Sequence, residues 1–200
     1  AYNMAPHKRW AMAFHGIGSE GEKANAHGAI DLDSFHVELS IMEHQTAENV
    51  KRFVRDRILF RAGTPFSIHS DHARELVGRV MTELANNFGY INTSTGGYCP
   101  MGNSIIERFW SYFNICVRNL TDEQYQNVAD HIQHIAWAWN TTVHGTSGVR
   151  PFEVMTGTSP VMLTDAMVLP PLINADINLD NTREAAAAYT QYAREHGDYK

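Results

Sequence analysis

Short apolar segments separated by polar turns occupy the first part of the chain. Residues 10–17 are mostly apolar, residues 18–23 form a glycine-containing polar turn, and residues 26–31 and 35–42 are two further apolar segments with a tight connection between them. Segments of this length, bounded by turn residues, are typical of strands. The pattern predicts three consecutive antiparallel strands.

The apolar spacing becomes helical further along. Thr46 fits the N-cap of a helix, apolar residues then recur at three- and four-residue intervals, and Gly63-Thr64-Pro65 ends the helix. Beyond it we expect a strand at 66–69, a helix at 73–88, a strand at 90–93, a glycine-rich loop to 102, and helices at 103–118 and 121–143. This order predicts an α/β fold with a mixed sheet covered by helices.

The chain changes character after Leu169. A Pro-Pro pair and an irregular acidic stretch come first, and an alanine-rich helix is predicted over residues 182–195. We therefore expect one domain over residues 1–165 and a linker or tail over residues 166–200. A length of 200 residues with 44% hydrophobic residues suits one domain with a sizeable core.

Charge, cysteine and histidine content narrow the function classes. A net charge of −6 gives no general basic surface, so this domain alone should bind DNA weakly, because phosphate neutralisation supplies most non-specific affinity. Cys99 and Cys116 form neither a disulfide framework nor a closed zinc site on their own, which fits a reducing compartment. His131 and His134 have a spacing that could suit a metal, although solvated helix histidines are the more ordinary interpretation.

No feature of the chain predicts a membrane segment or a secretory leader. No apolar run approaches the ~20 residues needed to cross a bilayer. The first ten residues lack an apolar stretch flanked by a basic segment. We expect an intracellular protein that is not secreted and does not enter a membrane.

Two acidic residues stand at the ends of predicted elements. Asp71 follows the strand at 66–69, and Glu107 lies in the first turns of the helix at 103–118, with 35 residues between the two acids. Paired carboxylates can hold two Mg²⁺ ions for in-line phosphoryl transfer, because hard cations take oxygen ligands. The spacing alone is weak, since surface acids at element ends would look the same.

Four segments carry motifs, in a fixed order along the chain. They are Asp31-x-x-Ser34 with Thr46-Ala47-Glu48; Gly63-Thr64-Pro65 leading to His69-Ser70-Asp71; Tyr98-x-Pro100-x-x-Asn103-x-x-x-Glu107-Arg108; and Asn140-Thr141-Thr142-x-His144 followed by Thr146-x-Gly148-x-x-Pro151-Phe152-Glu153 and Gly157. Together they resemble the catalytic core of retroviral integrases, most closely the version in gypsy-type LTR retrotransposons. The resemblance covers residues 6–165, about four-fifths of the chain.

The resemblance implies an RNase H-like fold, a five-stranded mixed sheet with helices on both faces. The implied activity is polynucleotidyl transfer: a water or another hydroxyl cuts the element's DNA end, and the freed 3′-hydroxyl then attacks target DNA. Asp71 and Glu107 would be the second and third catalytic acids, holding two Mg²⁺ or Mn²⁺ ions. The implied partners are element-end DNA, target DNA, further copies of the chain in a homodimer or larger oligomer, and integrase domains outside this chain. The implied location is the nucleus, a virus-like particle or an integration complex.

The chain departs from the family pattern at the first catalytic acid. The family has a W-x-M-D-F-x-G type of context on its first strand, and this chain has Trp10-Ala11-Met12-Ala13-Phe14-His15-Gly16. Ala13 therefore stands where the first catalytic aspartate is expected. Because that acid bridges both metals in the family, we expect this chain to be inactive, with Asp31 a poorly placed substitute. An engineered substitution and natural decay or domestication both account for the alanine.

One face of the predicted helix that carries Glu107 is polar, with residues at positions 107, 111, 114 and 118 in a single stripe. In the family this face meets the element's DNA end, whereas an ordinary solvated stripe would have the same spacing. The residues that the resemblance implies in nucleic-acid contacts are Tyr98, Asn103, Ser111, Asn114 and Arg118.

Trp110, Tyr112, Trp137 and Trp139 supply more large aromatics on the two long helices than one small core obviously needs. Aromatic residues are enriched at the centres of protein interfaces. We therefore predict that the chain self-associates through these helices, with a tryptophan at the contact. The competing interpretation is that all four residues pack inside one chain.

Two other functions fit parts of the sequence. A DDE transposase of a DNA element would share the arrangement of Asp71 and Glu107, although the closing segment from Pro151 to Gly157 favours an integrase. A domesticated integrase-like protein, acting as a non-catalytic scaffold in a DNA complex, would account for Ala13.

Overall fold

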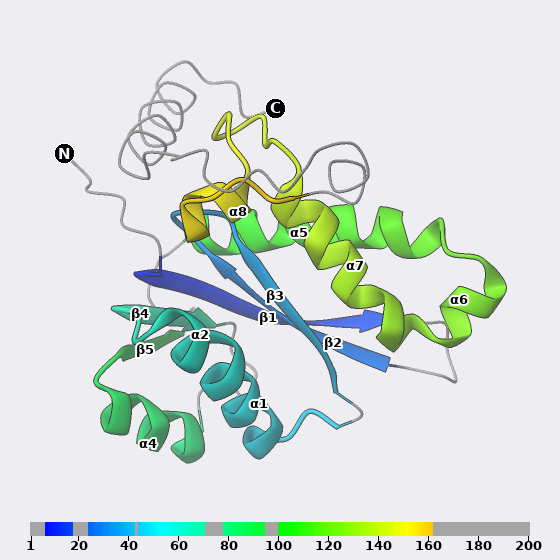
Figure 1. Ribbon diagram of the computed structural model, residues 1–200. Coiled ribbons are helices and arrows are strands. Elements are labelled where there is room, and N and C mark those ends of the chain that lie inside the picture. The colour runs from blue at the N-terminus through cyan, green and yellow to red at the C-terminus, as the bar shows by residue number, and fades with distance from the viewer. Residues whose placement is uncertain (1–6, 18–23, 43, 71–77, 95–99, 162–200) are drawn as a thin grey trace.

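The computed structural model describes residues 7–17, 24–42, 44–70, 78–94 and 100–161. Five strands form one sheet in the order β3-β2-β1-β4-β5 (Figure 1). The strands are β1 Arg9–Ile17, β2 Ala24–Asp31, β3 Val37–Met42, β4 Ser67–Ser70 and β5 Ile91–Ser94. The helices are α1 Ala47–Phe53, η1 Val54–Leu59, α2 Phe60–Ala62, α4 Arg79–Phe88, α5 Pro100–Arg118, α6 Asp122–Gln126, α7 Val128–Thr141 and α8 Pro151–Thr156.

Strand direction changes at β1, the central strand. β1, β2 and β3 pair antiparallel, whereas β1, β4 and β5 pair parallel. Parallel neighbours need a long crossover, and the α1–η1–α2 segment and the segment that contains α4 supply these crossovers. The five-stranded mixed sheet and the antiparallel start of the chain are therefore confirmed.

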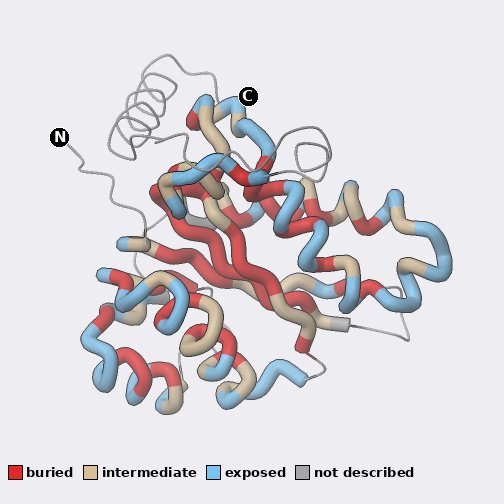
Figure 2. The backbone as a smooth tube through the Cα atoms, in the orientation of Figure 1, coloured by how far each residue is buried: buried red, intermediate tan, exposed pale blue. Residues whose placement is uncertain are grey.

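Helices cover both faces of the sheet (Figure 1). α5 and α7 pack on one face, and α1, η1 and α4 pack on the other, each with its own buried apolar cluster. Figure 2 shows the buried strands enclosed between the two layers. We call these two sides of the sheet the α5 face and the α1 face.

Alternation along β1 assigns its side chains to the two faces. Trp10 and Met12 belong to the cluster on the α1 face, whereas Ala11 and Ala13 pack with the cluster on the α5 face. This is the period of two that a strand imposes on its side chains. Position 13 therefore lies on the same side of the sheet as the helix that carries Glu107.

The helix predicted after Thr46 is present and has a wide turn in its middle. The Thr46 hydroxyl accepts a hydrogen bond from the backbone N–H of Asn49 at 3.3 Å, as an N-cap should. From Val54 to Leu59 the helix is π-helical, which the apolar spacing did not predict. Buried residues from both segments, including Phe53 and Val54, face the sheet.

The prediction of one helix over residues 121–143 is wrong. At Asn127 the backbone leaves the helical region, with φ −109° and ψ 36°, so α6 and α7 are separate. The Asn127 amide donates to the carbonyl of Glu123 at 3.2 Å, which satisfies an acceptor at the end of α6. The break lets α7 start anew with Val128 buried against the core.

Two predicted helices are only partly covered by the described residues. The helix predicted at 73–88 is described from Arg79 onward as α4, and residues 71–77 lie outside the described part. The tail predicted over residues 166–200, with its helix at 182–195, also lies outside it. The boundary between a domain at 1–165 and a tail at 166–200 therefore stays a prediction.

Two amide side chains of α7, one of them from the closing motif, bind backbone groups of β3. Asn140 on α7 accepts from the backbone N–H of Val37 at 2.9 Å and donates to the Val37 carbonyl at 3.0 Å. Gln133, two turns earlier, donates to the Leu39 carbonyl at 2.9 Å. β3 is an edge strand, so these two amides satisfy backbone groups that no neighbouring strand reaches.

The unpredicted helix α8 accounts for the rest of this motif. Pro151 occupies its first turn, and Glu153 returns to accept from the backbone N–H and the guanidinium of Arg150, at 3.4 and 2.9 Å. Gly157 ends the helix with φ 74°, a left-handed conformation that favours glycine. Proline at the start and glycine after the end are a local signal that the sequence interpretation overlooked.

Candidate active site

Ala13 lies in the middle of β1, with its side chain half-buried on the α5 face. Its partner across the antiparallel pair is Gly28 on β2. On its other side β1 pairs with β4, and the last pair in that register is Met12 with Ser70. Asp71 directly follows Ser70 in the sequence and lies outside the described residues.

Glu107 lies on α5, the helix that packs against β1 and β2, and its side chain is exposed. Its neighbours Ile106, Phe109 and Trp110 are buried in the core of the α5 face, so the helix is anchored there by apolar packing. Ala13 and the helix that carries Glu107 therefore lie on one side of the sheet, as the resemblance requires.

The residues predicted to contact nucleic acid differ in how far their side chains are exposed. The Ser111 hydroxyl donates to the Glu107 carbonyl at 3.0 Å within the helix, and Arg118 is exposed at the helix end. Asn114 is half-buried, and together with Arg118 it lines a pocket of about 390 Å³ at the end of β1. Tyr98 and the side chain of Asn103 lie outside the described part of the structure.

A polar and aromatic contact that the sequence interpretation missed connects β1 to α5. The Nε2 atom of His15 lies 2.8 Å from the Oδ1 atom of Asn114. The His15 ring also stacks on Trp110, with centroids 4.7 Å apart and planes 11° from parallel. His15 follows Ala13 by two residues, so the period of β1 alone could have placed both side chains on the same face.

Trp110 fills the space beside the Ala13 position. A Cβ atom built on Gly28 would lie 2.7 Å from two atoms of the Trp110 ring, so the ring rests directly on the glycine backbone. Cβ positions of paired residues in neighbouring antiparallel strands are about 5 Å apart. The surroundings of Ala13 on the β2 side are therefore aromatic.

Asp31 lies away from Ala13 and is held in its own turn. It pairs with Trp10, three residues along β1 from Ala13, and its carboxylate accepts from the Ser34 backbone N–H at 2.9 Å and from the Ser34 hydroxyl at 2.5 Å. Burial raises the pKa of Asp31 to about 6. A buried carboxyl committed to its own turn is poorly suited to hold a metal near position 13.

The described side chains do not fit the two-metal centre that the family implies. Two Mg²⁺ ions need several carboxylate oxygens, whereas the side chain of Ala13 is a methyl group. Within the described ranges, no three His, Cys, Asp or Glu side chains come together as a metal-binding group. His131 and His134 are neighbours with ring centroids 5.8 Å apart, and no third ligand joins them in the described part of the chain.

The chain was compared with proteins of known sequence and structure. No protein-family model matches it. The Tf2-3 transposon polyprotein of Schizosaccharomyces pombe is 22% identical over 151 residues, which cover 76% of this chain and 11% of that polyprotein. The chain therefore spans about a tenth of the length of this curated relative.

Solved integrase structures share the fold. The HTLV-2 integrase catalytic core domain, in complex with magnesium and in its trimeric form, matches with a TM-score of 0.58 and 16% identity, over 76% of this chain and 98% of that one. A chain of the simian T-cell lymphotropic virus intasome, bound to a PP2A regulatory subunit, matches with a TM-score of 0.65 and 15% identity, over 86% and 59%.

The chain therefore has the fold of retroviral integrase catalytic cores, and its sequence is similar to a segment of a transposon polyprotein. In this fold Asn140 of the closing motif connects α7 to β3, and Pro151, Glu153 and Gly157 begin and end α8. None of the helices in the described part of the chain has the length and apolar character needed to cross a membrane.

Proposed function

We propose that this chain is the core of a DNA integrase whose phosphoryl-transfer centre is inactive in the form given by its sequence. Intact cores of this kind would process the 3′ ends of the element's DNA and join them to target DNA. Ala13 is the observation that carries the proposal, because it is on the α5 face of β1, one residue beyond the Met12–Ser70 pair. Asp71 and Glu107 would be the remaining catalytic and metal-binding acids.

The alanine removes a negative group that no nearby described residue restores. Gly28 and Trp110 surround the position on the β2 side, and Asp31 is held in its own turn. This chain would therefore catalyse no metal-dependent phosphoryl transfer. Its own residues would instead position DNA, with the exposed Ser111 and Arg118 and the half-buried Asn114 of α5 as the proposed contacts.

The test is restoration of the acid. Ala13→Asp should bind Mn²⁺ with heats that the unmodified chain does not show, and Ala13→Asn, which has nearly the same shape without the charge, should behave like the unmodified chain. Calorimetry that gives the same heats for all three forms would contradict the placement of the first acid at position 13. Strand transfer on element-end DNA above background by the unmodified chain would contradict its inactivity.

A second candidate function is a non-catalytic scaffold in a DNA complex. The packing of Trp110 on Gly28 and the His15–Asn114 contact favour it, because they fill the area around position 13 with structural contacts. If Ala13→Asp binds Mn²⁺ and gains strand transfer, a single substitution separates this chain from an active integrase. If Ala13→Asp binds Mn²⁺ but gains no strand transfer, more than one residue separates this chain from an active integrase. That result would support the scaffold function.

Self-association is part of the proposal, with one of the predicted aromatics at the contact. Trp110 and Trp139 are buried within the chain, and Tyr112 packs on Trp139 with ring centroids 5.2 Å apart. Trp137 remains 42% exposed on α7, beside Phe152. The surplus of aromatics is therefore smaller than the sequence suggested, and we assign the contact to Trp137.

Light scattering across a range of protein concentrations tests this assignment. The unmodified chain should exceed its monomer mass of 22.5 kDa, and Trp137→Ser should shift it toward the monomer. Tyr125→Ser removes a similarly exposed aromatic from α6 and should leave the mass unchanged. A monomer for the unmodified chain at high concentration would contradict the proposal. Partners of such an assembly would be element-end DNA, target DNA and other integrase domains, in the nucleus or an integration complex.

A further inference from the structure

The most basic segment of the chain lies on the α1 face, away from Ala13 and Glu107. Residues 47–62 contain five of the 16 Lys and Arg residues and two of the 22 acidic residues, which gives this segment a net charge of +3 in a chain of −6. The segment forms α1, η1 and α2. Positive charge is therefore concentrated on one helical segment of an acidic protein.

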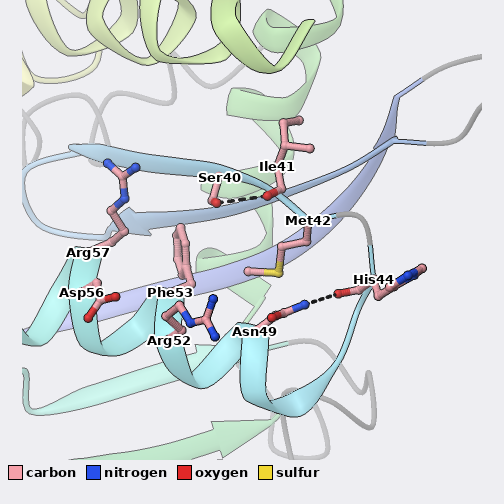
Figure 3. A pocket seen from close by; sticks show the side chains of 9 residues that line it. All are labelled: Ser40, Ile41, Met42, His44, Asn49, Arg52, Phe53, Asp56 and Arg57. Atoms are coloured by element: carbon pink, nitrogen blue, oxygen red, sulfur yellow. Dashed lines mark hydrogen bonds between the residues drawn. The ribbon is translucent and has the colours of Figure 1, made fainter.

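A pocket of about 370 Å³ opens between this segment and the end of β3 (Figure 3). Its apolar floor contains Phe53 and Met42, and its polar rim contains two arginines and an asparagine. Figure 3 shows the guanidinium groups of Arg52 and Arg57 on either side of the Phe53 ring. The residues that line it are Ser40, Ile41, Met42, His44, Asn49, Arg52, Phe53, Asp56 and Arg57.

Both arginines have donor groups to spare within the described residues. No described carboxylate lies within 4.0 Å of Arg52, which is exposed. Arg57 has one long contact, 3.7 Å to Glu38, and Glu38 is shared with His36 and Arg61. A guanidinium carries five N–H donors, so these two groups can accept further anionic oxygens.

The one acid in the pocket wall is already neutralised. Asp56 accepts two hydrogen bonds from Arg55, at 2.6 and 3.1 Å, and these hold the pKa of Asp56 below its ordinary value. The pocket therefore presents two cationic groups and no unpaired carboxylate among its described residues.

The π-helical segment explains why both arginines reach the same pocket. Residues five apart in an α-helix point about 140° away from each other around the axis, since each residue turns by about 100°. The wider turn of a π-helix, closed by i→i+5 hydrogen bonds, brings them closer to one side. Arg52 precedes η1 and Arg57 lies within it, so the segment aligns the two side chains.

We propose that this pocket and its two arginines bind consecutive backbone phosphates of a nucleic acid. Two separated guanidinium groups suit a chain of anions better than a single small anion, and the surrounding net positive charge favours a polyanion. The site lies on the opposite face of the sheet from Ala13, so it adds a second DNA contact to the one proposed on α5. The proposal does not depend on any catalytic activity of the chain.

Salt-dependent binding of the full chain to duplex DNA tests the site. Arg52→Gln should weaken binding by up to about tenfold at 0.1 M salt and reduce the slope of log affinity against log salt by about 1. The double variant Arg52→Gln/Arg57→Gln should reduce this slope by about 2. Arg79→Gln is the matched control, because Arg79 is exposed on α4 and already pairs with Glu83 at 2.6 Å. It should leave the affinity and the slope unchanged.

Arg52 makes no salt bridge with a described carboxylate, so its substitution should not disturb folding, and thermal unfolding of each variant checks this. DNA binding by Arg52→Gln equal to that of Arg79→Gln would overturn the proposal. Two other results would also overturn it. They are thermal stabilisation by inorganic phosphate, or binding of a poly-glutamate peptide, that is lost in Arg52→Gln although DNA binding is kept. Failure of Ala13→Asp to bind Mn²⁺ would count against the proposed function and leave this site intact.

Discussion

The two faces of the sheet are packed with different kinds of side chain. The α5 face is aromatic: Phe109, Trp110, Phe113 and Trp139 form a continuous set of ring contacts with centroids 5.1–6.2 Å apart. The α1 face is mainly aliphatic, with Val50, Val54, Ile58, Met81 and Leu84 buried. The difference places a cluster of aromatic rings on the same side of the sheet as Ala13 and mainly aliphatic side chains on the other side.

This contrast indicates why an alanine at position 13 is compatible with a well-packed core. Trp110 rests on Gly28 and stacks with His15, so the neighbourhood of Ala13 is filled by contacts that do not involve a carboxylate. The α1 face also buries a histidine. His27 is enclosed between Phe14 and Phe53, with ring centroids 4.6 and 4.3 Å away.

The largest expected effect comes from removing the central ring of the α5 face. Trp110→Ala should lower the free energy of unfolding by about 3–5 kcal/mol, because a buried ring is lost and a cavity is left. Urea unfolding measures the change. Ile115→Ala, at an exposed position of the same helix, is the control and should change stability by less than about 1 kcal/mol. Equal losses in the two variants would mean that the aromatic cluster does not hold this face.

A smaller effect should follow from adding one methyl group under that ring. Gly28→Ala should destabilise the chain by up to about 3 kcal/mol, because the new Cβ would meet the rigid Trp110 ring at 2.7 Å. Gly16→Ala, on the same strand pair with nothing within 4 Å, should have little effect. In the Trp110→Ala background the penalty at position 28 should largely disappear. A penalty that persists there would show that strand geometry, and not the ring, limits this position.

Two buried groups on β2, His27 and Asp31, should make stability depend on acid pH with opposite signs. Burial lowers the pKa of His27 to about 3, below the 6.5 of an exposed histidine, so the folded state loses stability as pH falls below 6.5, by about 2 kcal/mol at pH 5. Asp31 has the opposite sign: burial raises its pKa to about 6, so the folded state gains about 1 kcal/mol over the same fall in pH.

Urea unfolding at pH 7 and pH 5 tests both signs. His27→Leu should make the chain less sensitive to acid, and Asp31→Asn, which keeps an acceptor for Ser34, should make it more sensitive. The same pH dependence in both variants and the unmodified chain would show that neither group changes its proton affinity on folding.

The sequence predicted the sheet well because strands are short, apolar and bounded by turns. It could not predict the break at Asn127, where the backbone leaves the helical region although the helical pattern of apolar residues continues on both sides. The π-helical segment from Val54 to Leu59 is equally hidden, since apolar spacing cannot distinguish an i→i+4 from an i→i+5 turn over six residues. Local patterns give the type of an element more readily than its interruptions.

The candidate site shows the same limit. Motif spacing placed Ala13 on a central strand and Glu107 on a helix, and both placements agree with the structure. The contact of Trp110 with Gly28 could not be predicted, because it depends on the register of β1 with β2 and on how α5 docks across them. A tryptophan three residues after Glu107 looked available for an interface in the sequence, whereas it is committed to the core.

The amides of Gln133 and Asn140 along β3 have a consequence for aggregation. An uncovered edge strand is a template on which another chain can add a strand, and it is a common starting point for intermolecular β-structure. Asn140 occupies both backbone groups of Val37, and Gln133 occupies the carbonyl of Leu39, so strand addition there must first displace α7. The species prone to aggregate would therefore be a partly unfolded chain with α7 detached, and the capture of β3 by its own helix keeps the sheet from growing between molecules.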